Sequence, residues 1–179
     1  MVPISESLCA LLTDDSSFIT ALGLRATPGQ AVPNHATSFL LANWVLAYVL
    51  MSTRGTKFRL GLDHNVAPRE DVSKYGEAAV QAGKISRSAL NKLKRQEAAH
   101  ANAVEGFPLF VAAILAALFA GVPTETINTI GVWYTASRLT YSWLYSHIES
   151  PGLSYLRSVA WWSGNISCIT GLVLAGKKL

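Results

Sequence analysis

Six polar residues with side chains suited to chemistry lie at helical spacing within apolar parts of the chain. They are Arg95, Asn102, Glu105, Arg138, Tyr141 and Tyr145. Separations of three, four and seven residues place the first three on one helical face and the last three on another. An ionisable side chain at bilayer depth is costly unless it faces the interior of a bundle or a partner. The two sets therefore predict a polar site held between membrane helices.

These side chains suit either a structural or a chemical role. A buried Glu105 needs a cation or hydrogen-bond donors. Arg138 is the only charged residue of segment 126–146, so a purely structural ion pair between the two is one interpretation. Guanidinium and phenol groups can instead hold a carboxylate or a thiolate, which predicts a ligand clamp. Arg157 and Ser158 begin the last apolar segment, where Arg157 taken alone would be an interfacial anchor.

The elements that must position these residues are apolar and long. Half of the 179 residues are hydrophobic and 15% are charged, which disfavours a soluble enzyme. The mean hydropathy of +0.28 agrees. Four segments with at most one Asp, Glu, Lys or Arg each approach the ~20 residues that cross a bilayer as a helix, and we expect spans at about 36–52, 98–120, 126–146 and 158–176. The sequence predicts an all-α, integral-membrane, antiparallel four-helix bundle, with a soluble bundle as the weaker alternative.

Basic residues are concentrated between the first two spans. Ten of the fifteen Lys and Arg residues lie in segment 53–97, and the net charge of the chain is +4. By the positive-inside rule this loop is cytoplasmic and both termini lie on the opposite side. Its cations should meet anionic membrane lipids, and without a base-reading motif we expect no nucleic-acid partner. We expect an N-terminal segment over 1–35, a membrane domain over 36–179, and a long polar loop with helical character over 76–94, before a second long helix that starts near Asn91.

Over residues 95–110 the chain reads RQEAAHANAVEGFPLF. This stretch resembles the second-helix signature of the MAPEG family, the membrane-associated proteins in eicosanoid and glutathione metabolism. The signature runs approximately Arg-x-x-Arg-Ala-x-x-Asn-x-x-Glu and continues with an aromatic residue and a proline. Further along the chain, a second set of residues resembles the family's third and fourth helices: Arg138, Tyr141, Tyr145, Arg157 and Ser158. The resemblance covers about residues 36–176, and the 63–69 loop is similar to that of fungal members, which often serve secondary metabolism.

The resemblance implies a membrane enzyme of the endoplasmic reticulum that assembles as a homotrimer and binds glutathione as co-substrate between neighbouring subunits, without a metal. Such an enzyme is a glutathione-dependent transferase, peroxidase or isomerase, and its lipophilic substrate enters from the lipid. By resemblance, the glutathione-binding residues are Arg95, His100, Asn102, Glu105, Arg138, Tyr141 and Tyr145. Arg157 matches the arginine that stabilises the glutathione thiolate, with Ser158 beside it, because a nearby guanidinium lowers the pKa of a thiol.

Two positions depart from the family pattern. Ala98 stands where many members have the second arginine of the signature, and Gly106 stands where some have a tyrosine. The interval from Tyr145 to Arg157 is also longer than in several relatives. Loss of one charge-assisted contact would weaken glutathione binding by about 1.5–3 kcal/mol. Two alternatives stay open: a glutathione-independent cyclase or isomerase of an apolar natural product, with Arg157, Glu105 and the tyrosines as acid–base groups, and a non-catalytic lipid-binding membrane protein.

Overall fold

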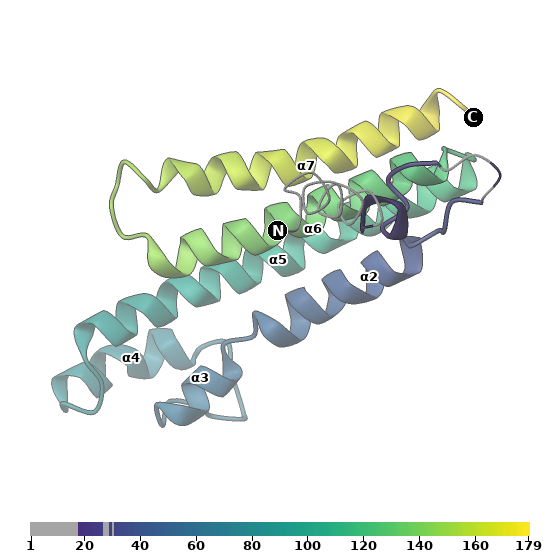
Figure 1. Ribbon diagram of the computed structural model, residues 1–179. Coiled ribbons are helices and arrows are strands. Elements are labelled where there is room, and N and C mark those ends of the chain that lie inside the picture. Colours follow the sequence, from purple (N-terminus) through teal and green to yellow (C-terminus); the bar gives the residue numbers. More distant parts are fainter. Residues whose placement is uncertain (1–17, 27–28, 30) are drawn as a thin grey trace, which may run out of the picture.

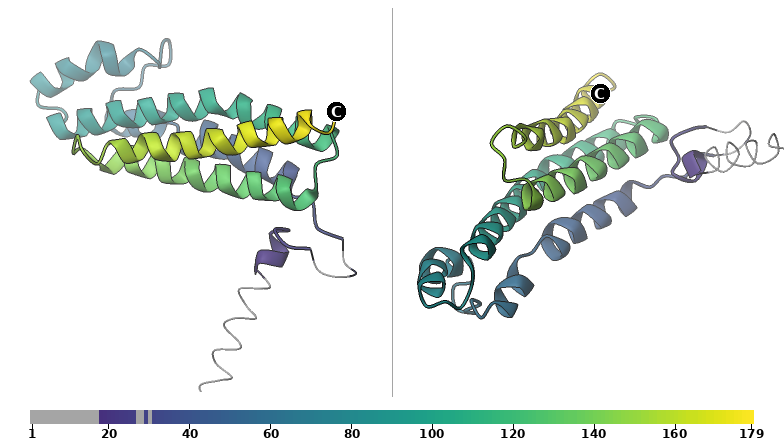
Figure 2. Two further views of the ribbon diagram at one scale, coloured as in Figure 1. Left: turned by 90° about the horizontal axis from the view of Figure 1, so that it is seen from above. Right: turned by 60° about the vertical axis from the view of Figure 1, so that its left-hand side comes forward.

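The computed structural model describes residues 18–26, 29 and 31–179, and within them every regular element is a helix (Figure 1). The elements are α2 (Ala36–Val45), η1 (Leu46–Leu50), α3 (Arg54–Arg59), α4 (Asp71–Gln81), α5 (Arg87–Phe119), α6 (Thr124–His147) and α7 (Tyr155–Gly176). The π-helical η1 continues α2 directly. Helices α5, α6 and α7 run antiparallel as long rods, and α2 packs against α5 and α6 (Figures 1 and 2). The predicted all-α class is confirmed for this part of the chain.

Local sequence explains where α5 begins and ends. Ser86 caps the helix, because its Oγ accepts a hydrogen bond of 3.1 Å from the Ala89 amide. The helix passes through Pro108 without interruption, although proline cannot donate to the carbonyl one turn earlier. It ends at a turn in which Gly121 has a φ of 65°, a conformation that glycine adopts at little cost. The turn reverses the chain, so α6 runs back along α5.

Not all the long helices are equally apolar. Three helical stretches are long and apolar enough to cross a membrane, namely Ala36–Arg59, Arg87–Phe119 and Tyr155–Gly176. Helix α6 is comparable in length, at 24 residues, and packs along α5 and α7. It carries several buried polar side chains, among them Arg138, which lower its apolar character. The span expected at 126–146 falls on α6 and stays a prediction.

The bundle core lies between α5, α6 and α7, and α2 closes one side of it. The aromatic rings of Phe110 and Tyr134 are buried and stack with centroids 4.2 Å apart. A Cβ on Gly131 would lie 2.3 Å from the Phe39 ring, so only glycine lets α2 approach α6 this closely. This packing fixes α6 against its neighbours and therefore fixes the side chains that α6 directs towards the site.

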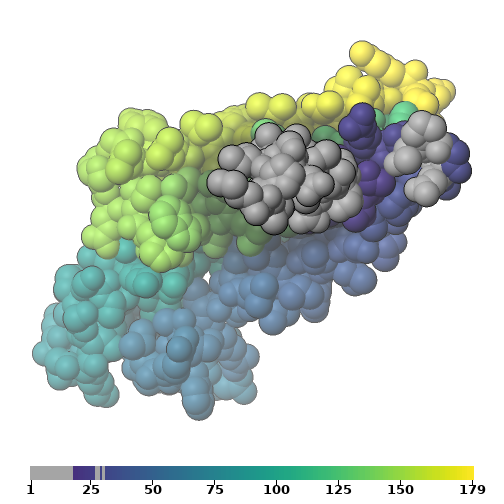
Figure 3. All heavy atoms as spheres, viewed as in Figure 1, coloured from purple at the N-terminus to yellow at the C-terminus, as the bar shows by residue number. Residues whose placement is uncertain are grey.

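The polar segment between the first two predicted spans is a folded cap, which we define as residues 54–86. Helices α3 and α4 lie at the end of the bundle opposite the C-terminus (Figures 1 and 3). Together with the start of α5 they enclose a small core of Leu62, Val72, Ala79, Ile85, Leu90 and Leu93. The helix expected over 76–94 is divided, because α4 ends at Gln81 and Gly83, at a φ of 68°, turns the chain. Helix α5 therefore starts at Arg87, earlier than expected.

Candidate active site

A cavity of about 720 Å³ opens where α6 gives way to α7. We call it the tyrosine cavity; its lining residues are Asn102, Tyr141, Tyr145, Pro151, Gly152, Ser154, Tyr155, Arg157, Ser158, Trp161 and Trp162. Helices α5, α6 and α7 and the connection between the last two all contribute to it. Asn102, Tyr141, Tyr145, Arg157 and Ser158 were expected from the sequence, and the structure brings these five together.

Aromatic and cationic groups face each other in the tyrosine cavity. Tyr141 and Tyr145 are one helical turn apart on α6, and their ring centroids are separated by 5.4 Å. The Cζ atom of Arg157 lies 4.4 Å from the centroid of the Tyr145 ring, a distance typical of cation–π contact. Its Nε donates to the carbonyl of Ser154 at 3.3 Å. The guanidinium is thus held at the start of α7 on the same cavity as the phenol groups of Tyr141 and Tyr145 and the Ser158 hydroxyl.

His100 and Glu105 belong to a different cavity of about 480 Å³, between the cap and α5. We call it the cap cavity; its lining residues are Ser52, Thr53, Arg54, Lys57, Pro68, Arg69, Glu97, His100, Ala101, Val104 and Glu105. The Nδ1 atom of His100 lies 2.9 Å from the carbonyl oxygen of Ala47. The α5 set predicted from the sequence is therefore divided, because Asn102 turns towards α6 and α7 while Glu105 turns towards the cap.

Arg138 is not on the lining of the tyrosine cavity but borders a small buried space that α2 and η1 also line. It is 3% exposed; its Nη2 donates to Oδ1 of Asn165 at 2.5 Å, and its Cζ lies 4.7 Å from the Tyr134 ring centroid. Its Nε and Nη1 are buried without a hydrogen-bond partner. Within the described residues the structural Glu105–Arg138 pair considered from the sequence does not form, because Glu105 is exposed while Arg138 is buried. A Cβ on Gly106 would lie 3.2 Å from Arg138 Nη2, so Gly106 makes room for the guanidinium.

Arg95 is directed away from both cavities. Its Nη2 donates to Oε1 of Glu149 at 2.6 Å, which links α5 to the connection between α6 and α7. Asn102 uses its amide to donate to the carbonyl of Ala98 at 3.0 Å. This leaves the Asn102 Oδ1 as the group that can accept a hydrogen bond at the cavity.

The sequence reasoning missed the aromatic wall of the tyrosine cavity and the ionic centre of the cap. Tyr155, Trp161 and Trp162 share one side of α7 with Ser158, and their spacing of three, four and seven residues was a usable signal. In the cap, the ammonium of the buried Lys57 lies 3.2 Å from Glu97 Oε1 and also donates to the Pro68 carbonyl.

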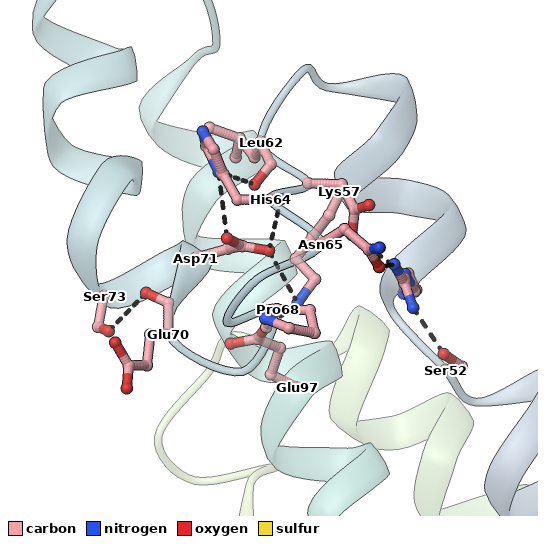
Figure 4. Close-up of polar contacts among 12 residues, drawn as sticks. Ser52, Lys57, Leu62, His64, Asn65, Pro68, Glu70, Asp71, Ser73 and Glu97 are labelled. Carbon is pink, nitrogen blue, oxygen red and sulfur yellow. Dashed lines mark hydrogen bonds and ion pairs between the residues drawn. The ribbon is translucent and has the colours of Figure 1, made fainter.

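Figure 4 shows the cap centre, where Asp71 is fully buried between Lys57 and His64. Asp71 Oδ2 lies 3.7 Å from Lys57 Nζ and accepts a hydrogen bond of 3.2 Å from the His64 amide. Asp71 Oδ1 lies 3.1 Å from His64 Nδ1. These contacts hold α3 and α4 on α5 and so shape the cap cavity. No group of three or more metal-ligating side chains gathers in the described ranges.

Comparison with known proteins identifies the family. The model of the MAPEG family matches residues 35–177, which include α2 to α7 and every site residue expected from the sequence. No curated protein and no solved structure matches the chain. The match confirms the resemblance found in the signature of α5, and it agrees with the long apolar helices. The chain therefore belongs to the MAPEG family, a family of helical integral-membrane proteins that includes glutathione-related transferases and isomerases.

Proposed function

We propose that this protein is a membrane-embedded, glutathione-dependent transferase, peroxidase or isomerase that acts on a lipophilic small molecule. The observation that carries the proposal is the tyrosine cavity, because five of the nine site residues expected from the sequence line it. Its volume of about 720 Å³ lies within the ~300–1,000 Å³ usual for small-molecule sites. The aromatic wall suits an apolar co-substrate, and the polar wall suits a peptide.

In this proposal Arg157 activates the thiol of glutathione. It is the only cation among the described lining residues of the tyrosine cavity. A free thiol has a pKa of about 8.5 and is mostly protonated at neutral pH. A guanidinium within a few ångströms favours the charged form, so it raises the fraction of nucleophilic thiolate. The Tyr145 hydroxyl and Ser158 hydroxyl can donate hydrogen bonds to the same sulfur.

The carboxylates of glutathione need cations other than Arg157. Ala98 and the buried position of Arg138 leave the tyrosine cavity of a single chain without a second one. Further positive charge lines the cap cavity, at Arg54 and Arg69. In a homotrimer, we propose that the cap of a neighbouring subunit brings these side chains to the tyrosine cavity. Arg54 is half-exposed and pairs with Asp63 at 3.3 Å, so it can exchange one carboxylate for another.

The membrane placement belongs to the same proposal. We assign α6 as the fourth span, since it packs along α5 and α7 over the length of the bundle. The basic cap then faces the cytoplasm and the C-terminus lies on the opposite side, in the membrane of the endoplasmic reticulum. The α6–α7 connection lies at the same end of the bundle as the cap (Figure 1). The tyrosine cavity, which this connection lines, would therefore open to cytoplasmic glutathione.

Calorimetry on the protein in nanodiscs tests the proposal with glutathione and with S-methylglutathione, which lacks the thiol. We expect both to bind. Arg157→Ala should leave the affinity for S-methylglutathione unchanged. The absorbance of the glutathione thiolate should appear at higher pH in this variant, and so should conjugation of glutathione to an aromatic electrophile. The matched control is Arg59→Ala, which removes a cation that lines neither cavity. No heat at millimolar concentration of either ligand would overturn glutathione dependence.

A glutathione-independent isomerase or cyclase is the second candidate, favoured because the described lining of the tyrosine cavity holds a single cation. In that case Arg157 and the phenols of Tyr141 and Tyr145 would act as acid–base groups on an apolar metabolite. The same titration separates the two functions, because this enzyme would give no heat with glutathione or S-methylglutathione.

A further inference from the structure

The connection between α6 and α7, residues 148–154, forms one wall of the tyrosine cavity. Pro151, Gly152 and Ser154 line the cavity from this connection. The Ser154 Oγ donates to the carbonyl of Pro151 at 2.6 Å, and this bond folds the second half of the connection into a turn. Ile148 packs on the buried cluster of Ala99, Tyr141, Leu144 and Ala160 and holds the start of the connection. The residues that line the cavity come later, and Leu153 is exposed, so a second interaction helps to keep this part in one position.

Arg95 and Glu149 supply this second interaction. Their side chains meet at 2.6 Å across 54 positions of sequence, and among the ion pairs of the described residues this one joins the connection to α5. The Arg95 side chain is 19% exposed, and its Nε is buried without a hydrogen-bond partner. The guanidinium is thus held against the protein and presents its Nη2 to one acceptor, Glu149.

The connection in turn positions Arg157. The carbonyl of Ser154 accepts a hydrogen bond of 3.3 Å from Arg157 Nε, and the guanidinium lies over the Tyr145 ring. If Glu149 is released, the Ser154 carbonyl gains freedom and Arg157 loses one of the two contacts that orient it. Arg95 is thereby linked to the cation of the tyrosine cavity through the backbone of the connection, because Ser150, next to Glu149, accepts a hydrogen bond of 3.0 Å from the Ser154 amide.

We propose that Arg95 and Glu149 are positioning residues, which fix the 148–154 wall and through it the orientation of Arg157. Arg95 then acts on the site without touching the ligand, unlike the role that its place in the family signature implies. The effect on activity rests on the proposed function, whereas the effect on the wall does not. The interval from Tyr145 to Arg157, which contains Glu149, is the part of the chain that this ion pair restrains.

Hydrogen exchange in nanodiscs measures the wall directly. The amides of Ser154, Leu156 and Arg157 donate to carbonyls within 150–154 and report its opening. An ion pair with one half-buried partner contributes little more than a surface pair, so Arg95→Ala and Glu149→Ala should each speed exchange over 148–157 by about two- to fivefold. Unchanged exchange in both variants would overturn the proposal.

The matched control is Arg87→Ala, which removes another arginine of α5. Arg87 pairs with Glu77 at the same distance of 2.6 Å, on the side of α5 that carries α4. This variant should loosen α4 and leave the exchange of 148–157 unchanged. If Arg87→Ala speeds hydrogen exchange over 148–157 as much as Arg95→Ala does, the effect is general destabilisation and the proposal fails.

Charge reversal supplies the functional readout. Arg95→Glu should lower kcat about two- to fivefold with the Kd for S-methylglutathione unchanged, and Glu149→Arg in the same molecule should restore kcat. A rise in Kd without loss of kcat would show instead that Arg95 contacts the ligand. If the wild type binds no glutathione, the proposed function fails, and hydrogen exchange still decides whether the pair holds the wall.

Discussion

Asn128 is expected to anchor the segment that precedes α2, and its replacement by alanine gives a measurable loss of stability. The side chain is fully buried near the start of α6. Its Nδ2 donates to the carbonyls of Gly23 at 3.0 Å and Pro33 at 2.8 Å, and its Oδ1 accepts from the His35 amide at 3.0 Å. At about 1 kcal/mol for each hydrogen bond, Asn128→Ala should lower the free energy of unfolding by about 3 kcal/mol. The hydrogen bond to Gly23 also depends on the absence of a side chain there, since a Cβ would lie 2.3 Å from the Asn128 Nδ2.

Unfolding in mixed detergent–SDS micelles, followed by circular dichroism, measures this loss. Asn91→Ala, at an exposed position of α5, is the matched control and should change the free energy by less than about 0.5 kcal/mol. Asn128 holds the chain on both sides of the exposed Arg25, so trypsin should also cleave there faster in the Asn128→Ala variant. A loss no greater than that of the control, with unchanged cleavage, would refute the idea that these three bonds hold the segment.

Two further predictions concern the bundle and the cap. Gly131→Ala would place a Cβ 2.3 Å from the Phe39 ring, so the same SDS titration should show a loss of about 1–3 kcal/mol; a neutral result would mean that the ring turns aside freely. Hydrogen bonds from Lys94 and Arg87 hold the pKa of Glu77 below its usual value of 4.5. Its contribution to stability is therefore present above that value and is lost as the pH falls through the lower, folded-state pKa. Glu77→Gln should speed hydrogen exchange in α4 at pH 7 but not at pH 3, after correction for intrinsic rates, and an equal effect at both would contradict this sign.

The long helices could be predicted from the sequence because apolar segments and the turns that end them are local features of the chain. The helices α6 and α7 lie within three residues of the apolar segments 126–146 and 158–176. Each segment ends at a Gly- or Pro-containing turn, which any reading of the chain can detect. The tyrosine cavity was likewise accessible in part, because Tyr141 and Tyr145 are one turn apart and Arg157 begins the next apolar segment.

The cap and the ion pairs had no such signal. Lys57 meets Asp71 and Glu97 across turns whose geometry depends on packing, and none of the three stands out among the other charges of this segment. Arg95 and Glu149 are 54 positions apart, with most of α5 and the whole of α6 between them. Partners brought together by tertiary structure leave no periodicity, so the sequence could place Arg95 on a face of α5 but could not say which group it meets there.

The two departures from the family pattern in α5 have different consequences. At position 106, a Cβ would lie 3.2 Å from Arg138 Nη2 and 3.3 Å from the Tyr134 hydroxyl, so a tyrosine there would require Arg138 to move. Gly106 and the buried Arg138, which donates to Asn165, are thus one linked feature of this chain. Because that feature directs Arg138 away from the tyrosine cavity, it deepens the deficit of positive charge that Ala98 creates. In the proposed function, the charge for a doubly anionic ligand would then come from outside the α5–α7 bundle, and the exposed arginines of the cap are one source.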